Sequence, residues 1–148
     1  MDSLPQHGHN DDLSRAIVEQ AQDAIIFADR EGIIRLWNRG AEIIFGFAAA
    51  EAIGHSLDLI VPERFRRAHN DGYRKAMDTG QVRLDGRVLT TRSQHKYGGR
   101  LYVDLSFGLV KDEAGHVTGA FAVGRDATAR YLEEQARRLA AAEQLAHQ

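Results

Sequence analysis

The chain of 148 residues contains no cysteine. This absence excludes disulfide bonds, thiolate metal sites, cysteine nucleophiles and switches based on thiol oxidation. No run of about 18 apolar residues offers a membrane-spanning helix, and the polar first ten residues lack the apolar segment of a secretion signal. The formal net charge is −2, so no basic excess points to nucleic acid. We therefore expect a cytoplasmic protein that binds neither membrane nor nucleic acid.

The motifs of common catalytic sites are missing as well. The chain has no G-x-S-x-G or H-E-x-x-H pattern and no glycine-rich loop of the phosphate-binding type. We therefore expect that the protein is not an enzyme and that it acts by binding other molecules.

What the chain does have is a hydrophobic period that changes about halfway along it. Before residue 80, two short β-rich runs are followed by segments with helical spacing, and from residue 82 apolar residues tend to recur at every second position. Glu31-Gly32 predicts a hairpin turn, and Gly46 predicts the end of a short helix. The expected strands are 24–29, 33–38, 82–95, 100–111 and 116–126, and the expected inner helices are 39–46 and 62–79. This order predicts an α+β fold in which a five-stranded antiparallel sheet carries its helices on one face.

Helices are also expected at both ends of the chain. Residues 1–11 are expected to be disordered, and Asp11 or Asp12 can cap the first helix. Residues 129–148 are rich in Ala, Glu, Arg and Leu and contain no Gly or Pro. Their spacing predicts an amphipathic helix of the coiled-coil type.

Both terminal helices carry apolar stripes that are too short to be stable alone in water. The first stripe contains Leu13 and Ile17, and the second contains Leu132 and Leu139. Burial against the outer face of the sheet or against a second chain would stabilise them. We expect a homodimer that forms through these flanking helices and the outer sheet face.

One later strand shows a clear alternation of apolar and polar or small residues. Its apolar positions are Leu101, Val103, Leu105, Phe107 and Leu109. This pattern predicts a half-buried strand whose Leu105 and Phe107 side chains face the core.

The longer inner helix, 62–79, has a histidine on its apolar stripe. The stripe consists of Phe65, Ala68, Gly72, Tyr73 and Ala76. His69 lies one turn after Phe65 and one turn before Tyr73, so its imidazole is expected to face the interior. Such a residue is either a core histidine whose ring nitrogen binds a backbone carbonyl, or a ligand to a molecule held there.

The order of short sequence motifs resembles that of a PAS domain over residues 12–128. The matching motifs are DAIIFADREGIIRLWNRGAEIIFGF, GHSLDLIVPERFR and GRDATAR, the last of which contains the Asp-x-Thr element as Asp126-Ala127-Thr128. The resemblance implies a sensory and protein-interaction module that is commonly dimeric. It also implies a small ligand or cofactor between the sheet and the helices, and a partner protein or effector domain that receives the signal.

Among PAS ligands, covalent flavin photochemistry and a cinnamate thioester both need a cysteine, which this chain lacks. Heme-binding oxygen sensors of the family carry a proximal histidine in a P-E-x-x-x-x-x-H context, and Pro62 to His69 reproduces that spacing. The resemblance implies heme b as a candidate cofactor, with His69 as the iron ligand. It also implies Arg87 or Arg92 as a donor to a bound gas molecule.

The pocket expected from these arguments lies between the longer helix and the sheet. Its apolar residues are expected to be Phe65, Tyr73, Leu89, Leu105, Phe107 and Phe121. If no heme is bound, the ligand is another small molecule or the site is empty.

Overall fold

The computed structural model describes residues 6–82 and 87–147. Its elements, in chain order, are α1 (Gln6–Gln20), β1 (Ala24–Asp29), β2 (Ile34–Trp37), α2 (Arg39–Phe45), α3 (Ala49–Ala52), the 3-10 helix η1 (Leu57–Leu59), α4 (Glu63–Thr79), β3 (Val88–Ser93), β4 (Leu101–Lys111), β5 (Val117–Asp126) and α5 (Thr128–Ala146). None of these helices combines the length and the apolar character needed to cross a bilayer.

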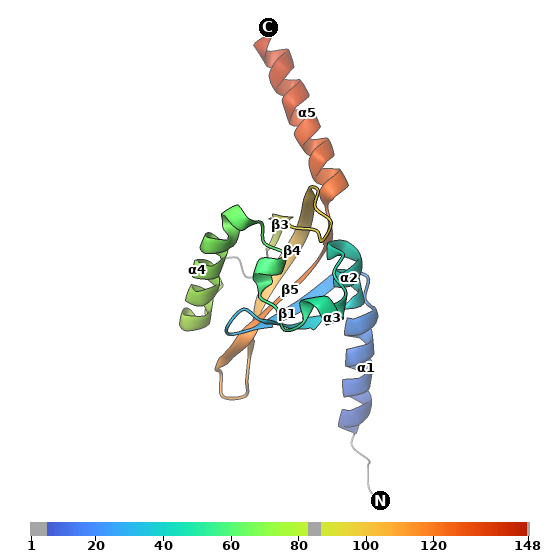
Figure 1. Ribbon diagram of the computed structural model, residues 1–148, viewed down its shortest axis with the longest axis vertical. Coiled ribbons are helices and arrows are strands. Elements are labelled where there is room, and N and C mark those ends of the chain that lie inside the picture. The colour runs from blue at the N-terminus through green and yellow to red at the C-terminus, as the bar shows by residue number, and fades with distance from the viewer. Residues whose placement is uncertain (1–5, 83–86, 148) are drawn as a thin grey trace, which may run out of the picture.

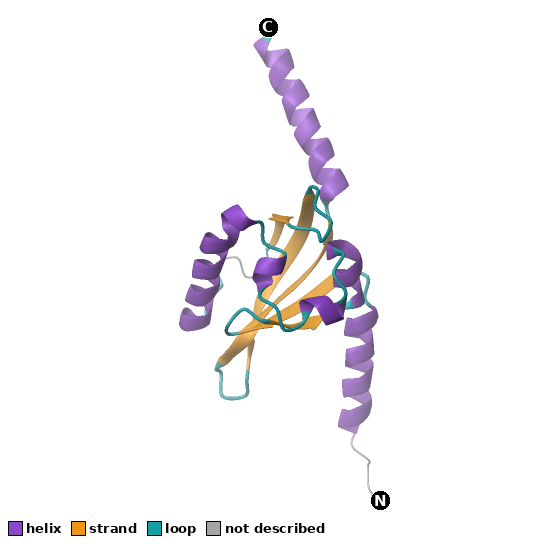
Figure 2. Ribbon diagram, in the orientation of Figure 1, coloured by secondary structure: helices purple, strands orange, loops and turns teal. Residues whose placement is uncertain are grey.

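The five strands form one antiparallel sheet in the order β2-β1-β5-β4-β3. Helices α2, α3 and α4 lie to one side of this sheet, whereas α1 and α5 extend from the body in opposite directions (Figures 1 and 2). The predicted α+β fold, a five-stranded antiparallel sheet with its inner helices on one face and a helix at each end, is therefore confirmed.

The hairpin between β1 and β2 turns at the predicted position. Gly32 adopts a positive φ of 79°, a conformation that suits glycine. The Asp29 carboxylate accepts hydrogen bonds from the amides of Glu31 (2.9 Å) and Ile33 (3.1 Å) and from Nε of Arg35 (2.9 Å). Burial raises the pKa of Asp29, but these hydrogen bonds outweigh burial and hold the pKa below its usual value.

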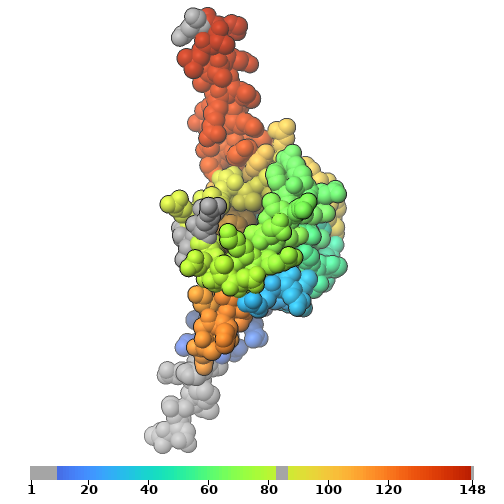
Figure 3. Space-filling model, turned by 90° about the vertical axis from the view of Figure 1, so that its left-hand side faces the viewer, coloured from blue at the N-terminus to red at the C-terminus, as the bar shows by residue number. Residues whose placement is uncertain are grey.

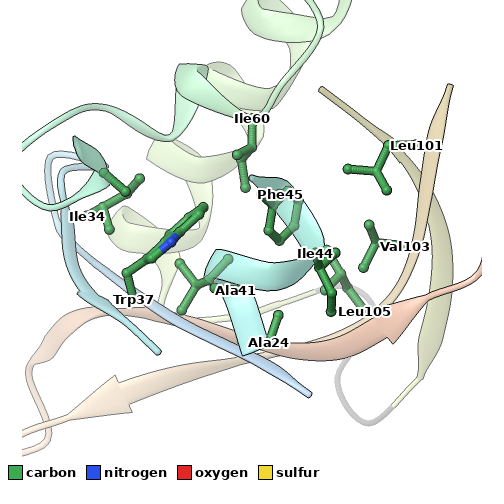
Figure 4. Packing of buried hydrophobic residues seen from close by; sticks show 12 residues of the cluster. Ala24, Ile34, Trp37, Ala41, Ile44, Phe45, Ile60, Leu101, Val103 and Leu105 are labelled. Carbon is green, nitrogen blue, oxygen red and sulfur yellow. The ribbon is translucent and has the colours of Figure 1, made fainter. Parts of the chain in front are cut away.

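The main core lies between α2 and the inner face of the sheet. Phe45 of α2, Ile34 of β2 and Val103 of β4 are its largest fully buried side chains. The ring centroids of Phe45 and Trp37 are 5.4 Å apart, and Figure 4 shows these side chains converging around α2. This short helix thus closes one half of the inner face of the sheet.

A buried asparagine joins the elements around α2. Asn38, only 4% exposed, caps α2, and its Oδ1 accepts hydrogen bonds from the amides of Ala41 (2.9 Å) and Ile25 (2.8 Å). Its Nδ2 donates to the carbonyl oxygens of Val18 (2.8 Å) and Asp23 (3.0 Å). One side chain therefore ties α1 to β1, β2 and α2.

Two boundaries differ from those predicted. Helix α1 begins at Gln6, so residues 6–11 are helical although we expected disorder; residues 1–5 lie outside the described part. The predicted strand 82–95 is observed only as β3, and its residues 83–86 also lie outside the described part. At its other end β3 stops at Ser93 because the amide of Gln94 donates to the carbonyl of Ile60 (2.8 Å) rather than to β4.

Candidate ligand-binding site

The second half of α4 is attached to the end of β1 by polar contacts. Tyr73 Oη lies 2.6 Å from the carbonyl oxygen of Asp29 and 3.0 Å from that of Ala28, and donates to them. Arg30 donates to the carbonyl oxygens of Met77 (3.4 Å) and Val117 (2.9 Å). Burial, with the nearby Asp29 charge, raises the pKa of Tyr73 to about 12. The phenol is therefore neutral at physiological pH and serves as a donor.

His69 lies one turn before Tyr73, on the same face of α4. The two ring centroids are 6.1 Å apart, and the rings are stacked at an interplanar angle of 27°. Because Tyr73 bonds to β1, this face of α4 is the one turned toward the sheet. The Nδ1 atom of His69 is buried, and among the described residues it has no hydrogen-bond partner. The core-histidine alternative predicts a bond from a ring nitrogen to a backbone carbonyl, and Nδ1 makes no such bond within that part of the chain.

The inner face of the sheet presents apolar side chains on the side of the helices. Leu89 of β3 is directly opposite Leu105 of β4, and Phe107 is directly opposite Ala122 of β5. Leu105 is buried in the core, whereas Leu89 and Phe107 are only partly buried. The predicted inward orientation of Leu89, Leu105 and Phe107 therefore agrees with the strand register.

Phe121, in contrast, lies on the other face of the sheet. It is directly opposite Gly108 of β4 and Phe27 of β1, and it is 36% exposed. Its ring covers Gly108, where a Cβ atom would collide with it. The prediction was wrong because the inward positions of β5 are the small residues Ala120, Ala122 and Gly124, so alternation turns Phe121 outward.

Phe65 does not reach the interior either. Its side chain is 41% exposed, and the guanidinium carbon of Arg64 lies 4.6 Å from the centre of its ring. Phe65 belongs to the first turn of α4, whereas the contacts that hold the helix to β1 come from Tyr73 and Met77, farther along. The helical period of α4 was predicted correctly, but its first turn is more exposed to solvent than its second half.

Of the two candidate arginines, Arg92 does not lie on the inner face opposite His69. Arg87 is exposed immediately before β3. Arg92 is directly opposite Tyr102, whereas the adjacent pair, Thr91 and Val103, faces the core. Successive residues of a strand point to opposite faces, so Arg92 starts on the outer face. The predicted role as a gas-ligand donor is therefore wrong for Arg92 in this arrangement, whereas for Arg87 it stays a prediction.

A shallow cavity of about 510 Å³, broadly open to solvent, lies between the start of α4 and β3, the edge strand of the sheet. Its lining residues are Pro62, Glu63, Arg64 and Arg92. Figure 3 looks onto the face that α4 covers, and the surface is hollowed beside this helix. Within the described residues, no group of three or more His, Asp or Glu side chains could hold a bare metal ion.

The outer face of the sheet receives the start of α5. Arg130 of this helix binds both carboxylate oxygens of Asp104, at 2.7 and 2.8 Å. Tyr131 stacks on Tyr102, with ring centroids 3.8 Å apart. The Thr128 hydroxyl accepts from the amide of Tyr102 (3.0 Å). The last helix is thus docked to the outer face of the sheet by its first turn, one of the two arrangements expected from the sequence, although these individual contacts were not predicted.

Comparison with known families and proteins agrees with this geometry. A family model described as PAS fold matches residues 13–127. The sensor protein FixL of Bradyrhizobium diazoefficiens is 35% identical over 79 residues, which cover 51% of this chain and 15% of FixL. The oxygen sensor protein DosP of Escherichia coli is 26% identical over 123 residues, which cover 82% of this chain and 15% of DosP. The chain therefore corresponds to a small part of each relative.

A solved structure has the same fold. The PAS domain of a protein from Colwellia psychrerythraea superposes with a TM-score of 0.67 at 21% identity, covering 78% of this chain and 94% of that domain. At this level of identity the likeness concerns the fold alone.

Proposed function

Because the chain belongs to the PAS family of sensory signal-transduction modules, we propose that it binds a small ligand between α4 and the inner face of the sheet. The observation that carries this proposal is the buried Nδ1 atom of His69, which lacks a partner among the described residues. Buried polar atoms in folded proteins are normally hydrogen-bonded, so a bound molecule would supply the missing partner. PAS domains are in general sensory modules rather than enzymes, and the proposed action is binding.

Heme b is the ligand that the residues favour. His69 offers an imidazole on the sheet-facing side of α4, and Leu89 and Phe107 offer partly buried apolar surface on the inner face of the sheet. The Pro62 to His69 spacing resembles that of heme-binding PAS domains, and one relative is named an oxygen sensor. A bound heme would supply an iron that binds oxygen, carbon monoxide or nitric oxide. An imidazole nitrogen of His69 would hold the iron.

Absorption spectroscopy of the chain titrated with hemin tests the heme proposal. The unmodified chain is expected to develop a saturable Soret band, and His69→Ala is expected to lose it without a change in thermal unfolding. His116→Ala is the matched control because that side chain is 81% exposed. Identical spectra for all three proteins would contradict the role of His69 as iron ligand. If hemin fails to bind, native mass spectrometry of the purified chain tests for another small ligand.

Homodimerisation through the terminal helices and the outer sheet face is the second part of the proposal. Leu13 and Ile17 of α1 are each 59% exposed, Leu139 of α5 is 63% exposed, and Phe121 lies on the outer face. A second copy of the chain would cover these apolar surfaces. Sedimentation at tens of micromolar is expected to give a dimer, and Leu139→Glu is expected to shift it toward monomer. A monomeric mass for the unmodified chain would contradict this part.

A further inference from the structure

A row of side chains connects the cavity at the start of α4 with the first turn of α5. Arg92 lines the cavity with Pro62, Glu63 and Arg64. The guanidinium carbon of Arg92 lies 5.3 Å from the centre of the Tyr102 ring, and its Nη1 lies 3.3 Å from the Tyr102 hydroxyl. Tyr102 in turn stacks on Tyr131 of α5. The cavity and the helix are therefore separated by only one side chain, that of Tyr102.

Arg92 has hydrogen-bonding capacity to spare. Its Nε atom is buried and finds no acceptor within the described part of the chain. Its bond to Tyr102 is long for a charged donor. An arginine fork suits the paired oxygens of a carboxylate or a phosphate. The lining residues of the cavity include two arginines, Arg64 and Arg92, and a single acidic residue, Glu63, so their formal charge is net positive.

The contact between Tyr102 and Tyr131 can transmit a movement of the Arg92 side chain to α5. The centroids of the two rings lie 3.8 Å apart, and the ring planes are inclined by 22°. A displacement of the Tyr102 ring would therefore displace Tyr131 of α5. Arg130 and Thr128 bind the sheet independently, through Asp104 and the backbone of Tyr102. A movement of Arg92 would thus alter how α5 is seated without releasing the helix.

We propose that this cavity is a second binding site, which takes a carboxylate or phosphate group on Arg92, and that α5 senses its occupancy through Tyr102 and Tyr131. Arg92 would turn from the Tyr102 ring toward the bound anion, and the stack would adjust. The site uses neither His69 nor heme. Its failure would therefore leave the proposed function untouched, and the reverse also holds.

Backbone NMR of the full 148-residue chain tests both parts of the proposal. The probes are sodium phosphate and sodium acetate, each compared with sodium chloride at equal ionic strength. At least one probe is expected to cause saturable shifts at the amides of Arg92 and Tyr131 that chloride does not cause. The probe that saturates identifies phosphate or carboxylate as the preferred group.

Three variants separate binding from coupling. Arg92→Met is expected to bind the probe about tenfold more weakly or not at all, because a charged hydrogen-bond donor is lost. Arg100→Met, which removes a charge from an exposed loop, is expected to behave like the unmodified chain. Tyr131→Leu is expected to keep the saturable shift at Arg92 and to lose the shifts in the rest of the first turn of α5.

The outcomes that overturn the proposal differ for its two parts. Shifts that do not saturate, or that persist unchanged in Arg92→Met, would show that no such site exists. Saturation at Arg92 without any response in α5 of the unmodified chain would show that the site is not coupled to the helix. Circular dichroism of each variant establishes that it is folded before its spectra are compared.

Discussion

The helices α2 and α4 lie on the same side of the sheet but are held in very different ways. The seven-residue α2 buries Gly40, Ala41, Ile44 and Phe45 and is capped at both ends, by the Asn38 side chain and by the left-handed Gly46. The 17-residue α4 buries only Met77. From length alone, the longer α4 would be expected to bury more residues than α2. The short helix closes the core, whereas the long helix contributes little to it and covers the region where we propose that a ligand binds.

Polar groups show the same contrast. All the hydrogen-bonding groups of the Asn38 amide, next to α2, are used within the protein. His69 on α4 keeps a buried nitrogen without a partner among the described residues. Low burial and a buried polar atom without a partner among the described residues thus coincide on α4, and the proposed ligand would supply that partner.

The largest expected difference in stability is between variants that truncate one phenylalanine of α2 and one of α4. Phe45 is fully buried, so Phe45→Ala should lower the free energy of unfolding by about 3–5 kcal/mol. Phe65 is 41% exposed, so Phe65→Ala should lower it by at most about 1 kcal/mol. Urea denaturation measures both values. Equal losses in the free energy of unfolding for the two variants would contradict the claim that α2 is packed more tightly than α4.

Replacing one glycine of each helix with alanine is expected to change the stability of the protein in opposite directions. A Cβ atom at Gly40 of α2 would overlap the carbonyl oxygen of Asp23, whereas one at Gly72 of α4 would meet nothing within 4 Å. Gly40→Ala should therefore destabilise the protein by about 1–3 kcal/mol. Gly72→Ala should stabilise it by about 0.5–1 kcal/mol, because alanine favours the helix. Thermal unfolding of the two variants checks the signs, and a destabilising Gly72→Ala would mean that α4 is packed as tightly as α2.

The attachment of α4 through Tyr73 predicts a smaller effect that depends on pH. The pKa of this phenol is raised from 10.0 to about 12 in the folded protein. A raised pKa means that the folded state holds the proton more tightly, so this stabilisation is complete below pH 10 and is lost as pH rises toward 12. Tyr73→Phe should lack that alkaline loss and should cost about 1 kcal/mol at neutral pH. The stability difference between the two proteins, followed from pH 8 to 12, tests this, and a constant difference would contradict it.

Local sequence patterns were sufficient for most of the fold. The alternation around Leu105 predicted β4, Glu31-Gly32 predicted the hairpin and Gly46 predicted the end of α2. The helical period also placed His69 on the same face as Tyr73. Each of these features is decided by neighbours in the chain, which is why a single sequence reveals it.

Features decided by register or by distant contacts could not be predicted in this way. A shift of one residue in a strand turns a side chain to the other face, and this is what separates Arg92 and Phe121 from the inner face of the sheet. The bond between Asp104 and Arg130 joins residues 26 positions apart. The central role of Asn38, which follows β2, depends on α1, β1 and α2 meeting around it, and no local pattern indicates that meeting.

Hydrogen exchange of the chain with and without hemin tests most directly the claim that α4, not α2, covers the ligand. Without hemin, the amides of α4 should exchange at least about tenfold faster than those of α2, because fewer buried contacts resist opening. With hemin, protection should rise in α4 and stay unchanged in α2. Equal protection of the two helices in the ligand-free chain, together with a hemin response in α2 and none in α4, would contradict the account.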